Sequence, residues 1–315
     1  YTMLTGIDIG GTKCAVLTGD GENIIERIAF PTTNVADTLS AIYAAVEKVG
    51  CGDAIGVSCG GPLDAERGVI LSPPNLPGWD NIAIVRELVQ RFAVPAALEN
   101  DANACALAEW RFGAGRGSKN MIFLTFGTGM GAGLILDGRL YRGTSGMAGE
   151  IGHVRMERFG PCGYGKAGSF EGFCSGGGIR QIGRMVAAEK LQTGQSVGFC
   201  QSADDLDRIT AKSIAEAAAA GDTDAIRVYE ICGEKLGQGL SILIDVLNPE
   251  KIVIGSIYER SGALLKTSME AAIEREALAA ARSVCRIVPA ELGDSVGDFA
   301  AIAVAAGALE RSQKK

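Results

Sequence analysis

The sequence has very little histidine, few aromatic residues and no long apolar run. One histidine occurs in 315 residues, and Phe, Trp and Tyr together make up 6% of the chain. The formal net charge of −7 gives no field that attracts nucleic acid or an anionic membrane. No apolar stretch reaches the roughly 18 residues that a membrane span needs, and no basic start precedes an apolar signal segment. We therefore expect a cytoplasmic protein that binds neither nucleic acid nor membrane.

Glycine, apolar residues and scattered cysteines are what the sequence does have. Apolar residues make up 47% of the chain, which is enough to bury a large core, and at this length a core usually divides into two domains. The nine cysteines are an odd number and lie mostly in apolar segments such as KCAVL and NACALA, which indicates reduced, packed thiols. Many of the 44 glycines are clustered, which is typical of backbone that approaches a ligand closely.

Strand and helix patterns alternate along the chain, which predicts an α/β protein. A glycine-rich stretch, GAGRGSKN, separates a first run of strands and helices from a second one. We predict an N-terminal α/β domain over residues 1–117 and a C-terminal α/β domain over residues 118–295. A last helix over residues 296–312 is expected to return and pack on the first domain.

Two glycine-rich turns each separate two apolar stretches. One is GIDIGGTKCAVL, centred on Gly10 and Gly11, and the other is FLTFGTGMGAGLIL, with its glycines over residues 127–133. Consecutive backbone N–H groups in such a turn form a nest for an anion, although a tight hairpin that needs positive φ explains the first turn equally well. A P-loop and a dinucleotide fingerprint are excluded, because a strand rather than a helix follows each turn. The repeat indicates two related halves, each contributing one nest to the phosphates of a nucleotide.

Asp8 precedes the first glycine turn by two residues and lies between Ile7 and Ile9. A turn-capping acid is one interpretation, but the apolar neighbours predict a buried strand, in which a carboxylate needs a partner. Carboxylate oxygens are ligands that Mg²⁺ prefers. Asp8 is therefore predicted to hold Mg²⁺ on a bound nucleotide, directly or through water.

The stretch ALENDANACALAEW places polar residues between an apolar strand and an alanine-rich helix. Ligands of open α/β sheets bind at the carboxyl ends of such strands. Helix capping by Asn100 or Asp101 needs only one polar side chain, whereas ENDAN supplies four. A carboxylate at this place can accept the proton of a hydroxyl whose oxygen attacks a γ-phosphoryl group. We predict Asp101 as that general base.

Six motifs occur in the order expected of the ROK family of sugar kinases and sugar-responsive repressors, which this chain resembles from Gly6 to its final helix. The motifs are GIDIGGTK, GGPLD, PNLPGW, ENDANA, FGTGMGAG and AGEIGH. The resemblance implies the actin/hexokinase-type fold, in which two RNase H-like α/β domains close an interdomain cleft over ATP–Mg²⁺ and a sugar. A homo-oligomer, by default a homodimer, is a further expectation from the family.

The resemblance also implies a ligand for individual residues. The two turns and the VIGS stretch are implied to contact ATP and its metal, and residues of four other motifs are implied to contact the sugar. The implied ATP residues are Asp8, Gly10, Gly11, Thr12, Lys13, Gly127, Thr128, Gly129, Gly131, Gly255 and Ser256. The implied sugar residues are Gly61, Asn100, Asp101, Glu150, His153 and Glu171, with Asp101 as the catalytic base.

The stretch GHVRMERFGPCGYGKAGSFEGFC departs from the family pattern. Family members commonly bind a structural zinc through the GH histidine and three cysteines of C-x-C-G-x-x-G-C-x-E. Depending on the alignment, Ser169 or Gly160 stands at a cysteine position, and at best Cys162 remains. His153 and Cys162 alone are too few ligands for a tetrahedral site. We expect no structural zinc, and we expect His153, three residues after Glu150, to face the sugar.

The leading function is an ATP- and Mg²⁺-dependent kinase of a free hexose or N-acylhexosamine, with glucose as the default substrate. The alternative is a non-catalytic sugar-binding or sugar-sensing regulatory protein of the same fold. The repressors of the family carry a helix-turn-helix before the first glycine turn. Here that hairpin begins at Gly6, and the net charge is acidic, so a DNA-binding role is not expected.

Two further features carry weaker expectations. Gly233, Gly237 and Gly239 interrupt a long helical pattern at a cost of about 1 kcal/mol each relative to alanine. Either another helix or the nucleotide base is then expected to pack closely on them. Trp79, in LPGWDN, is expected at a lid or an edge.

Overall fold

The computed structural model describes residues 2–314, which divide into two compact units. Unit 1 contains the residues up to Lys119, the segment Gly133–Ala148 and the residues from Glu291 onward. Unit 2 contains Asn120–Ala132 and Gly149–Ala290. The first break lies two residues after the one expected at 117, but Gly133–Ala148 belongs with unit 1 rather than with the segment 118–295.

Unit 1 is built on a five-stranded sheet with the order β3-β2-β1-β4-β7. Strand β1 pairs antiparallel with β2 and parallel with β4, and β4 pairs parallel with β7. Two short strands, β5 and β6, pair with each other beside this sheet. The strands are β1 (Leu4–Ile9), β2 (Lys13–Gly19), β3 (Ile24–Pro31), β4 (Ala54–Cys59), β5 (Leu63–Asp64), β6 (Val69–Ile70) and β7 (Ala96–Asn100).

One face of this sheet is covered by α1 (Val35–Val49) and α2 (Ile84–Phe92). Ile7 and Ile9 of β1 point into this layer and pack in one apolar cluster with Ile42 of α1 and Leu88 of α2. Trp79 lies in the same cluster and is 0% exposed. The expectation of a lid or edge position for Trp79 was therefore wrong, because its indole fills the core.

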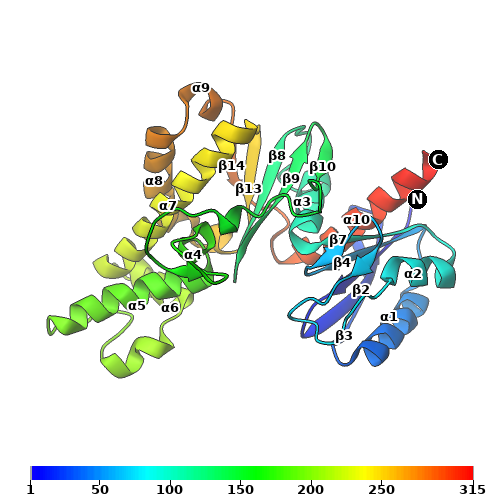
Figure 1. The fold of residues 1–315 in the computed structure, drawn as a ribbon, viewed down its shortest axis with the longest axis horizontal. Helices are drawn as coiled ribbons and strands as arrows, with labels where there is room; N and C mark the ends of the chain where they lie inside the picture. Colours follow the sequence, from blue (N-terminus) through cyan, green and yellow to red (C-terminus); the bar gives the residue numbers. More distant parts are fainter. Residues whose placement is uncertain (1, 315) are drawn as a thin grey trace. The chain divides into compact units, whose positions relative to one another are not determined.

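The opposite face of the sheet carries α3 (Asp101–Phe112) and α10 (Val296–Gln313), which run side by side in Figure 1. Helix α10 is rich in alanine, so its backbone comes very close to the strands. A Cβ added to Gly56 would lie 2.2 Å from the Ala301 carbonyl oxygen, and one added to Gly6 would lie 2.8 Å from the Ala301 Cβ. Glycine is required at both positions because no side chain fits between strand and helix.

A buried carboxylate connects the end of α3 to the segment that leads into α10. Glu109 is fully buried and accepts hydrogen bonds from the backbone N–H groups of Ala114 at 2.8 Å and Leu292 at 2.9 Å. Backbone donors therefore satisfy a charge that would otherwise be costly to bury.

The second sheet has the order β10-β9-β8-β13-β14, and β13 pairs parallel with both β8 and β14. Its first three strands in sequence are joined by tight turns, as β1, β2 and β3 are in the other sheet. The two sheets therefore repeat one connectivity, as the repeated glycine pattern predicts. The strands are β8 (Met121–Phe126), β9 (Met130–Leu136), β10 (Arg139–Tyr141), β13 (Lys251–Ile254) and β14 (Arg286–Pro289).

Strand β10 and the second half of β9 fall in unit 1, whereas β8, β13 and β14 fall in unit 2. The remainder of unit 2 is mostly helical, and α7 (Thr223–Leu247) packs along α8 (Ile257–Glu276) (Figure 1). A Cβ on Gly233 would lie 2.6 Å from the Leu265 carbonyl oxygen, and one on Gly237 would lie 2.4 Å from that of Met269. The close neighbour of these two glycines is thus another helix. The phenyl ring of Phe170 packs on Gly239 in the same way.

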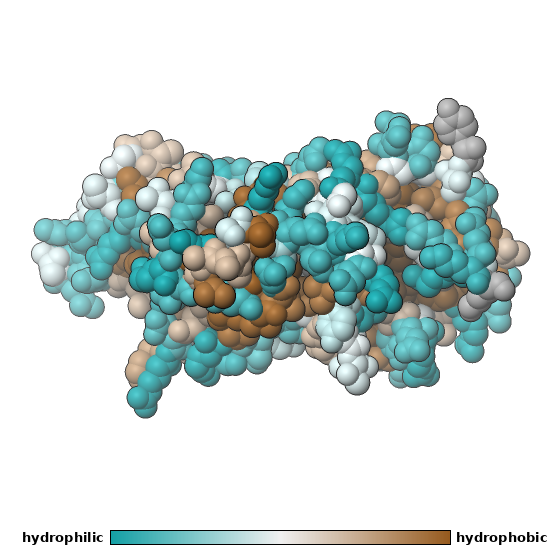
Figure 2. Space-filling model, turned by 90° about the horizontal axis from the view of Figure 1, so that it is seen from above, coloured by the Kyte–Doolittle hydropathy of each residue, from teal (hydrophilic) through white to brown (hydrophobic). Residues whose placement is uncertain are grey.

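The remaining elements are short or lie at the surface. Figure 2 shows hydrophilic residues over most of the face in view, with apolar patches between them. Within residues 2–314, no helix combines the length and the hydropathy needed to span a bilayer. The elements are η1 (Ile151–His153), β11 (Cys162–Gly163), β12 (Lys166–Ala167), α4 (Phe170–Phe173), α5 (Gly176–Gln192), η2 (Ala203–Arg208), α6 (Ala211–Ala219), α9 (Ala279–Arg282) and η3 (Gly293–Ser295).

Candidate active site

The parallel strands β1, β4 and β7 end together at one edge of the unit 1 sheet. Asp8 is in register with Ser58 of β4, and Ser58 with Glu99 of β7. Because neighbouring strands lie about 4.8 Å apart, the backbones of β1 and β7 are separated by about 10 Å here. Asp101 follows β7 directly, so the sheet brings Asp8 and Asp101 to the same edge. Cys59, at the end of β4, lies between them: burial is the main cause that raises the pKa of its thiol, and the negative charges of Asp101 and Asp8 raise it further.

Asp8 lies on the α10 side of the sheet, in an environment that disfavours its charge. Burial is the main cause that raises its pKa to about 6, and repulsion by Asp298 and Asp101 adds to the effect. A Cβ on Gly297 would lie 3.8 Å from the Asp8 carboxylate, which places the start of α10 beside it. Within residues 2–314, Asp8 makes no hydrogen bond or salt bridge, whereas Asp298 is paired with Arg27 at 2.9 Å. A partly buried, unpaired carboxylate of this kind is suited to a cation.

The first glycine turn is closed by a hydrogen bond from the Gly10 N–H to the Lys13 carbonyl at 3.1 Å. The Thr32 hydroxyl donates to the Gly10 carbonyl at 2.6 Å and fixes the turn from the end of β3. A Cβ on Gly11 would lie 2.5 Å from the backbone oxygen of Asn75, so the turn also packs against the PNLPGW segment. The N–H groups of Gly11 and Thr12 make no hydrogen bond in the part of the chain that the structure describes, as expected of an anion nest.

The sequence left open whether Asn100 or Asp101 caps the helix and which of them faces a ligand, and the structure assigns one role to each. Asn100 is the N-cap of α3, since its Oδ1 accepts the Asn103 N–H at 2.8 Å. The Asp101 side chain reaches solvent, and among residues 2–314 it accepts only the N–H of Ala102, at 2.8 Å. The dense surroundings nevertheless raise the pKa of its carboxyl through desolvation. Asp101 is therefore available to a ligand, while Asn100 starts the helix.

Glu99 is a structural residue of this edge that the sequence did not distinguish from its polar neighbours. It is 1% exposed, and its carboxylate accepts the Asn103 amide at 3.0 Å and the Arg142 Nε at 2.7 Å. It also accepts the backbone N–H of Asn100 at 3.2 Å. Glu99 therefore holds the backbone that presents Asp101. Asp298 is a further neighbour of the site that no sequence motif marked. Asn75 is another neighbour, and it lies in the PNLPGW motif, but it was assigned no role from the sequence.

The second glycine turn, in unit 2, is supported by two other segments. The Gly127 N–H donates to Gly129 at 3.1 Å, and the Gly127 carbonyl accepts the N–H of Gly176, the first residue of α5, at 2.8 Å. A Cβ on Gly127 would lie 3.6 Å from the Ser256 hydroxyl oxygen. Ser256 has a φ of 56°, a strained value for a residue other than glycine, and such strain is concentrated at functional sites.

The side chain of Glu171, which lies on α4, is hydrogen-bonded to this second turn. Its Oε2 accepts the N–H of Met130 at 3.0 Å, and a Cβ on Gly129 would lie 2.9 Å from that oxygen. A Cβ on Gly152 would lie 2.1 Å from the Met130 carbonyl oxygen and 3.4 Å from the Glu171 Cβ. The short η1 turn with Glu150 and His153 at its ends is thereby packed against the start of β9 and against α4.

His153 is an exposed residue whose environment is a loop rather than a core. Its backbone carbonyl accepts the Lys166 ammonium at 2.7 Å, and its ring meets that of Tyr164 edge-on at 6.4 Å between centroids. Its N–H donates to the Glu150 carbonyl at 3.2 Å, so Glu150 and His153 lie on one turn. The Lys166 side chain thus helps to hold this turn in place.

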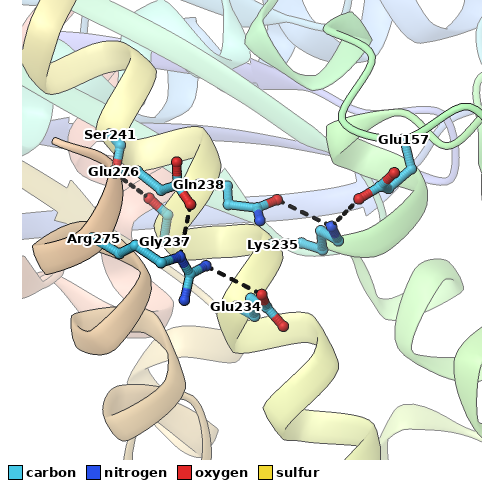
Figure 3. Close-up of polar contacts among 8 residues, drawn as sticks. All are labelled: Glu157, Glu234, Lys235, Gly237, Gln238, Ser241, Arg275 and Glu276. Carbon is cyan, nitrogen blue, oxygen red and sulfur yellow. Dashed lines mark hydrogen bonds and ion pairs between the residues drawn. The ribbon is translucent and has the colours of Figure 1, made fainter.

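The loop that departs from the zinc-binding pattern is fastened by side-chain contacts to α5 and α7. The Gln181 amide accepts the Cys162 N–H at 2.8 Å and donates to the Cys162 carbonyl at 2.9 Å. Lys235 of α7 is ion-paired with Glu157 and hydrogen-bonded to Gln238, as Figure 3 shows. The described residues include no cluster of three or more His, Cys, Asp or Glu side chains arranged for a metal.

The predicted site residues therefore form two groups, each within one unit. The unit 1 group is Asp8, Gly10, Gly11, Thr12, Lys13, Gly61, Asn100 and Asp101, and the unit 2 group is Gly127, Thr128, Gly129, Gly131, Glu150, His153, Glu171, Gly255 and Ser256.

Known proteins resemble this chain over almost its full length. The sequence pattern of the ROK family matches residues 4–308. The glucokinase of Halalkalibacterium halodurans is 35% identical over 93% of this chain and 91% of its own length. The solved ROK family glucokinase of Streptomyces griseus, in complex with glucose and AMPPNP, is 30% identical, with a TM-score of 0.74 over 97% of this chain and 99% of its own. The Escherichia coli transcriptional dual regulator NagC is 34% identical over 79% of this chain and 60% of its own length. The predicted fold class is confirmed by these matches.

Proposed function

This chain belongs to the ROK family, and we propose that it is an ATP-dependent kinase that phosphorylates a hydroxyl of a free hexose or N-acylhexosamine. Glucose is the first candidate because the glucokinase relatives match nearly end to end, whereas NagC is matched over 60% of its length. The observation that carries the proposal is the meeting of Asp8, Asp101 and an open glycine turn at one sheet edge.

In this proposal Asp101 is the general base. Its carboxylate takes the proton of the reacting sugar hydroxyl while the hydroxyl oxygen forms a bond to the γ-phosphorus. The bond between the γ-phosphorus and the β,γ-bridging oxygen breaks at the same time, and ADP leaves with that electron pair. The raised pKa of Asp101 brings the carboxyl closer to the pH at which a base is most effective.

Asp8 fits the role of a magnesium-binding residue, because it is a partly buried carboxylate with a pKa of about 6 and no salt bridge within residues 2–314. A cation beside it would favour its charged form. The metal would neutralise phosphate charge when nucleotide is bound. Lys13, exposed at the start of β2, would add a second positive charge near the same phosphates.

The remaining predicted site residues of the two units are assigned to ATP or to the sugar. The N–H groups of the turns at Gly10–Thr12 and Gly127–Gly131 would bind ATP phosphates, and Gly255 and Ser256 would lie beside the adenosine. The proposed sugar contacts are Gly61, Asn100, Asp101, Glu150, His153 and Glu171. The loop around Cys162 is proposed to keep its shape through the contacts of Gln181 and Lys235, without zinc.

An ADP-release assay over a panel of hexoses and N-acylhexosamines tests the proposal. Asp101→Asn is expected to lower kcat by about 10²-fold or more, since general-base catalysis contributes that much. Sugar affinity, measured by calorimetry, should change little because the amide keeps the shape of the side chain. Asp204→Asn, which removes an acid from the exposed η2 helix of unit 2, is the matched control and should retain full turnover.

Two outcomes would contradict the proposal. If the unaltered protein binds a sugar but releases no ADP with any panel member, the non-catalytic, sugar-sensing alternative is favoured. If Asp101→Asn turns over as fast as the Asp204→Asn control, Asp101 is not the base. Stoichiometric zinc in elemental analysis would separately overturn the zinc-free interpretation of the loop.

A further inference from the structure

A cavity of about 340 Å³ lies within unit 1. Its walls are formed by β7, α3, α10 and the β9–β10 hairpin. Every lining residue belongs to unit 1. Binding pockets for small molecules span about 300–1,000 Å³, so this cavity has room for a compact metabolite.

The lining of this cavity is strongly basic in a protein that is acidic overall. Its five cationic residues are Arg111, Arg139, Arg142, Arg311 and Lys314. Glu99 and Glu310 are the only two acids among the described residues that line it. The cavity therefore carries an excess of three positive charges, although the whole chain has a net charge of −7.

The two acids are already engaged, and they leave several cations without an acceptor. Arg111 binds both carboxylate oxygens of Glu310, at 2.7 and 2.9 Å, and Arg142 binds Glu99. The side chains of Arg139 and Arg311 make no salt bridge or hydrogen bond to any residue that the structure describes. The Nε of Arg111 is buried and also has no acceptor within residues 2–314.

Like charges crowd the guanidinium of Arg311. Although Arg311 is an exposed residue, partial burial of its guanidinium and then the neighbouring Arg142 lower its pKa, with a smaller contribution from Arg111. Glu99 and Glu310 oppose this effect only in part. An anion in the cavity would relieve the repulsion.

We propose that this cavity binds a small phosphate-bearing anion, either inorganic phosphate or a compact phosphate ester. The planar guanidinium group offers paired N–H donors that match the spacing of phosphate oxygens, and such contacts are among the strongest hydrogen bonds in proteins. Arg139 and Arg311 supply guanidinium groups whose N–H donors have no acceptor among the described residues, and Lys314 adds a further positive charge to the lining.

The cavity is connected to the candidate active site through Glu99. The carboxylate of Glu99 holds both Arg142 in the cavity wall and the backbone N–H of Asn100, the residue before Asp101. An anion that draws Arg142 away from Glu99 changes the contacts of that backbone. We therefore expect phosphate to change the KM for the sugar, a consequence that rests on the proposed kinase activity, whereas the binding itself does not.

Calorimetric titration with inorganic phosphate, and separately with glycerol 3-phosphate, tests the proposal and distinguishes the two sources of the anion. The test variant is R139Q/R311Q, and the matched control is R208Q/K212Q, which removes the same charge from exposed positions in unit 2. Saturable binding to the unaltered protein is expected to weaken about tenfold or more in R139Q/R311Q, because two charged hydrogen-bonding groups are lost. The control should bind as the unaltered protein does.

A variant of opposite sign completes the experiment. Glu310→Gln releases the guanidinium N–H donors of Arg111 and removes one negative charge from the cavity, so the anion should bind severalfold more tightly. The proposal is overturned if the unaltered protein shows no saturable binding, or if both double variants weaken it equally. It is also overturned if R139Q/R311Q binds unchanged, since phosphate then binds elsewhere, for example in the nucleotide site. Anion binding at the cavity with no sugar phosphorylation would instead contradict only the kinase proposal.

Discussion

The glycine turns at Gly10–Gly11 and Gly127–Gly131 each join the first two strands of a sheet, and the two sheets have the same connectivity. The acidic residue beside each turn, however, has a different environment. Asp8, near the turn of unit 1, has no hydrogen-bonding or ion-pairing partner in the described residues, and its pKa is raised to about 6. Glu171, near the turn of unit 2, accepts a backbone N–H of that turn. The first acid is left for a ligand that the protein does not supply, whereas the second is partly used to hold the protein together.

This difference shows how one duplicated pattern can divide two tasks. A turn whose acid is unsatisfied gains most when a cation arrives with an anionic ligand. A turn whose acid is hydrogen-bonded to its own backbone is preorganised and needs little rearrangement on binding. The comparison therefore predicts that changes at the first turn affect chemistry, and that changes at the second affect positioning.

The largest expected effect that tests this comparison is that of Asp8→Asn. Removing the metal-binding charge should lower kcat by about a hundredfold, the scale of losing one electrostatic contact to the reacting phosphate. The same change should stabilise the free protein, because the folded state no longer has to bury a carboxylate. Activity and stability are thus expected to move in opposite directions.

The sign of the stability change follows from the pKa. The folded-state pKa of Asp8, about 6, lies above its ordinary value of 3.8, so its contribution to stability is complete below pH 3.8 and is lost as the pH rises through 6. Asp8→Asn should therefore match the unaltered protein in acid and exceed it by up to about 3 kcal/mol above pH 6 in urea unfolding. Asp294→Asn, at an exposed site of unit 1, should show no such pH dependence. Equal stability of Asp8→Asn and the unaltered protein across this range would contradict the argument.

A smaller effect is expected in the free energy of unfolding, which Gly11→Ala should lower more than Gly129→Ala does. A Cβ added at Gly11 would meet a backbone oxygen of Asn75 at 2.5 Å, which can move only with the PNLPGW segment. A Cβ added at Gly129 would meet the end of the Glu171 side chain at 2.9 Å, which can rotate away. Gly11→Ala should cost about 2 kcal/mol of unfolding free energy and Gly129→Ala less than about 1 kcal/mol.

Thermal unfolding of the two variants, together with the KM for ATP, measures this contrast. If Gly129→Ala proves the more damaging change, the second turn is the more rigidly packed of the two, and the comparison must be reversed.

The smallest expected effect is that of Lys235→Met on the loop beside the second turn. Lys235 is 11% exposed, pairs with Glu157 and lies 5.5 Å above the ring of Phe173 in α4, the helix that carries Glu171. Losing these contacts should raise the KM for the sugar about fivefold, equivalent to ~1 kcal/mol, with kcat nearly unchanged. Lys235→Arg should restore much of the loss.

Lys266→Met is the matched control for Lys235→Met, because Lys266 is exposed on α8 and pairs only with Glu270 among the described residues. A fall in kcat without a change in KM for Lys235→Met would assign Lys235 to the chemistry instead of to the shape of the loop.

Much of the architecture was predictable from the sequence, because apolar alternation and glycine turns are local signals. The strand before Gly10 and the strand before Asp101 were both readable, and parallel pairing then places their ends at one edge. The choice between Asn100 and Asp101 as helix cap was not readable, since both residue types cap helices. It depends on which side chain reaches the Asn103 N–H in the folded protein.

Contacts between residues far apart in the sequence were also not readable. Asp298 acts on Asp8, and Arg142 on Glu99, across more than 40 residues in each case, and neither pair belongs to a local motif. Trp79 was misplaced for a related reason: its flanking glycine and aspartate suggest exposure, while the core that surrounds it comes from other segments. Electrostatic environment and long-range packing therefore had to come from the structure.

The packing of α10 on Gly6 and Gly56 has a consequence for how the protein is made. Translation produces β1 and β4 first and α10 last, so the face of the sheet that α10 covers together with α3 stays partly uncovered while more than 200 residues are synthesised. All residues of unit 2 lie between Asn120 and Ala290, so this unit is complete before α10 is synthesised and is free of this delay. The half of the protein that leaves the ribosome first is thus the half that finishes folding last, and it depends on protection from aggregation until then.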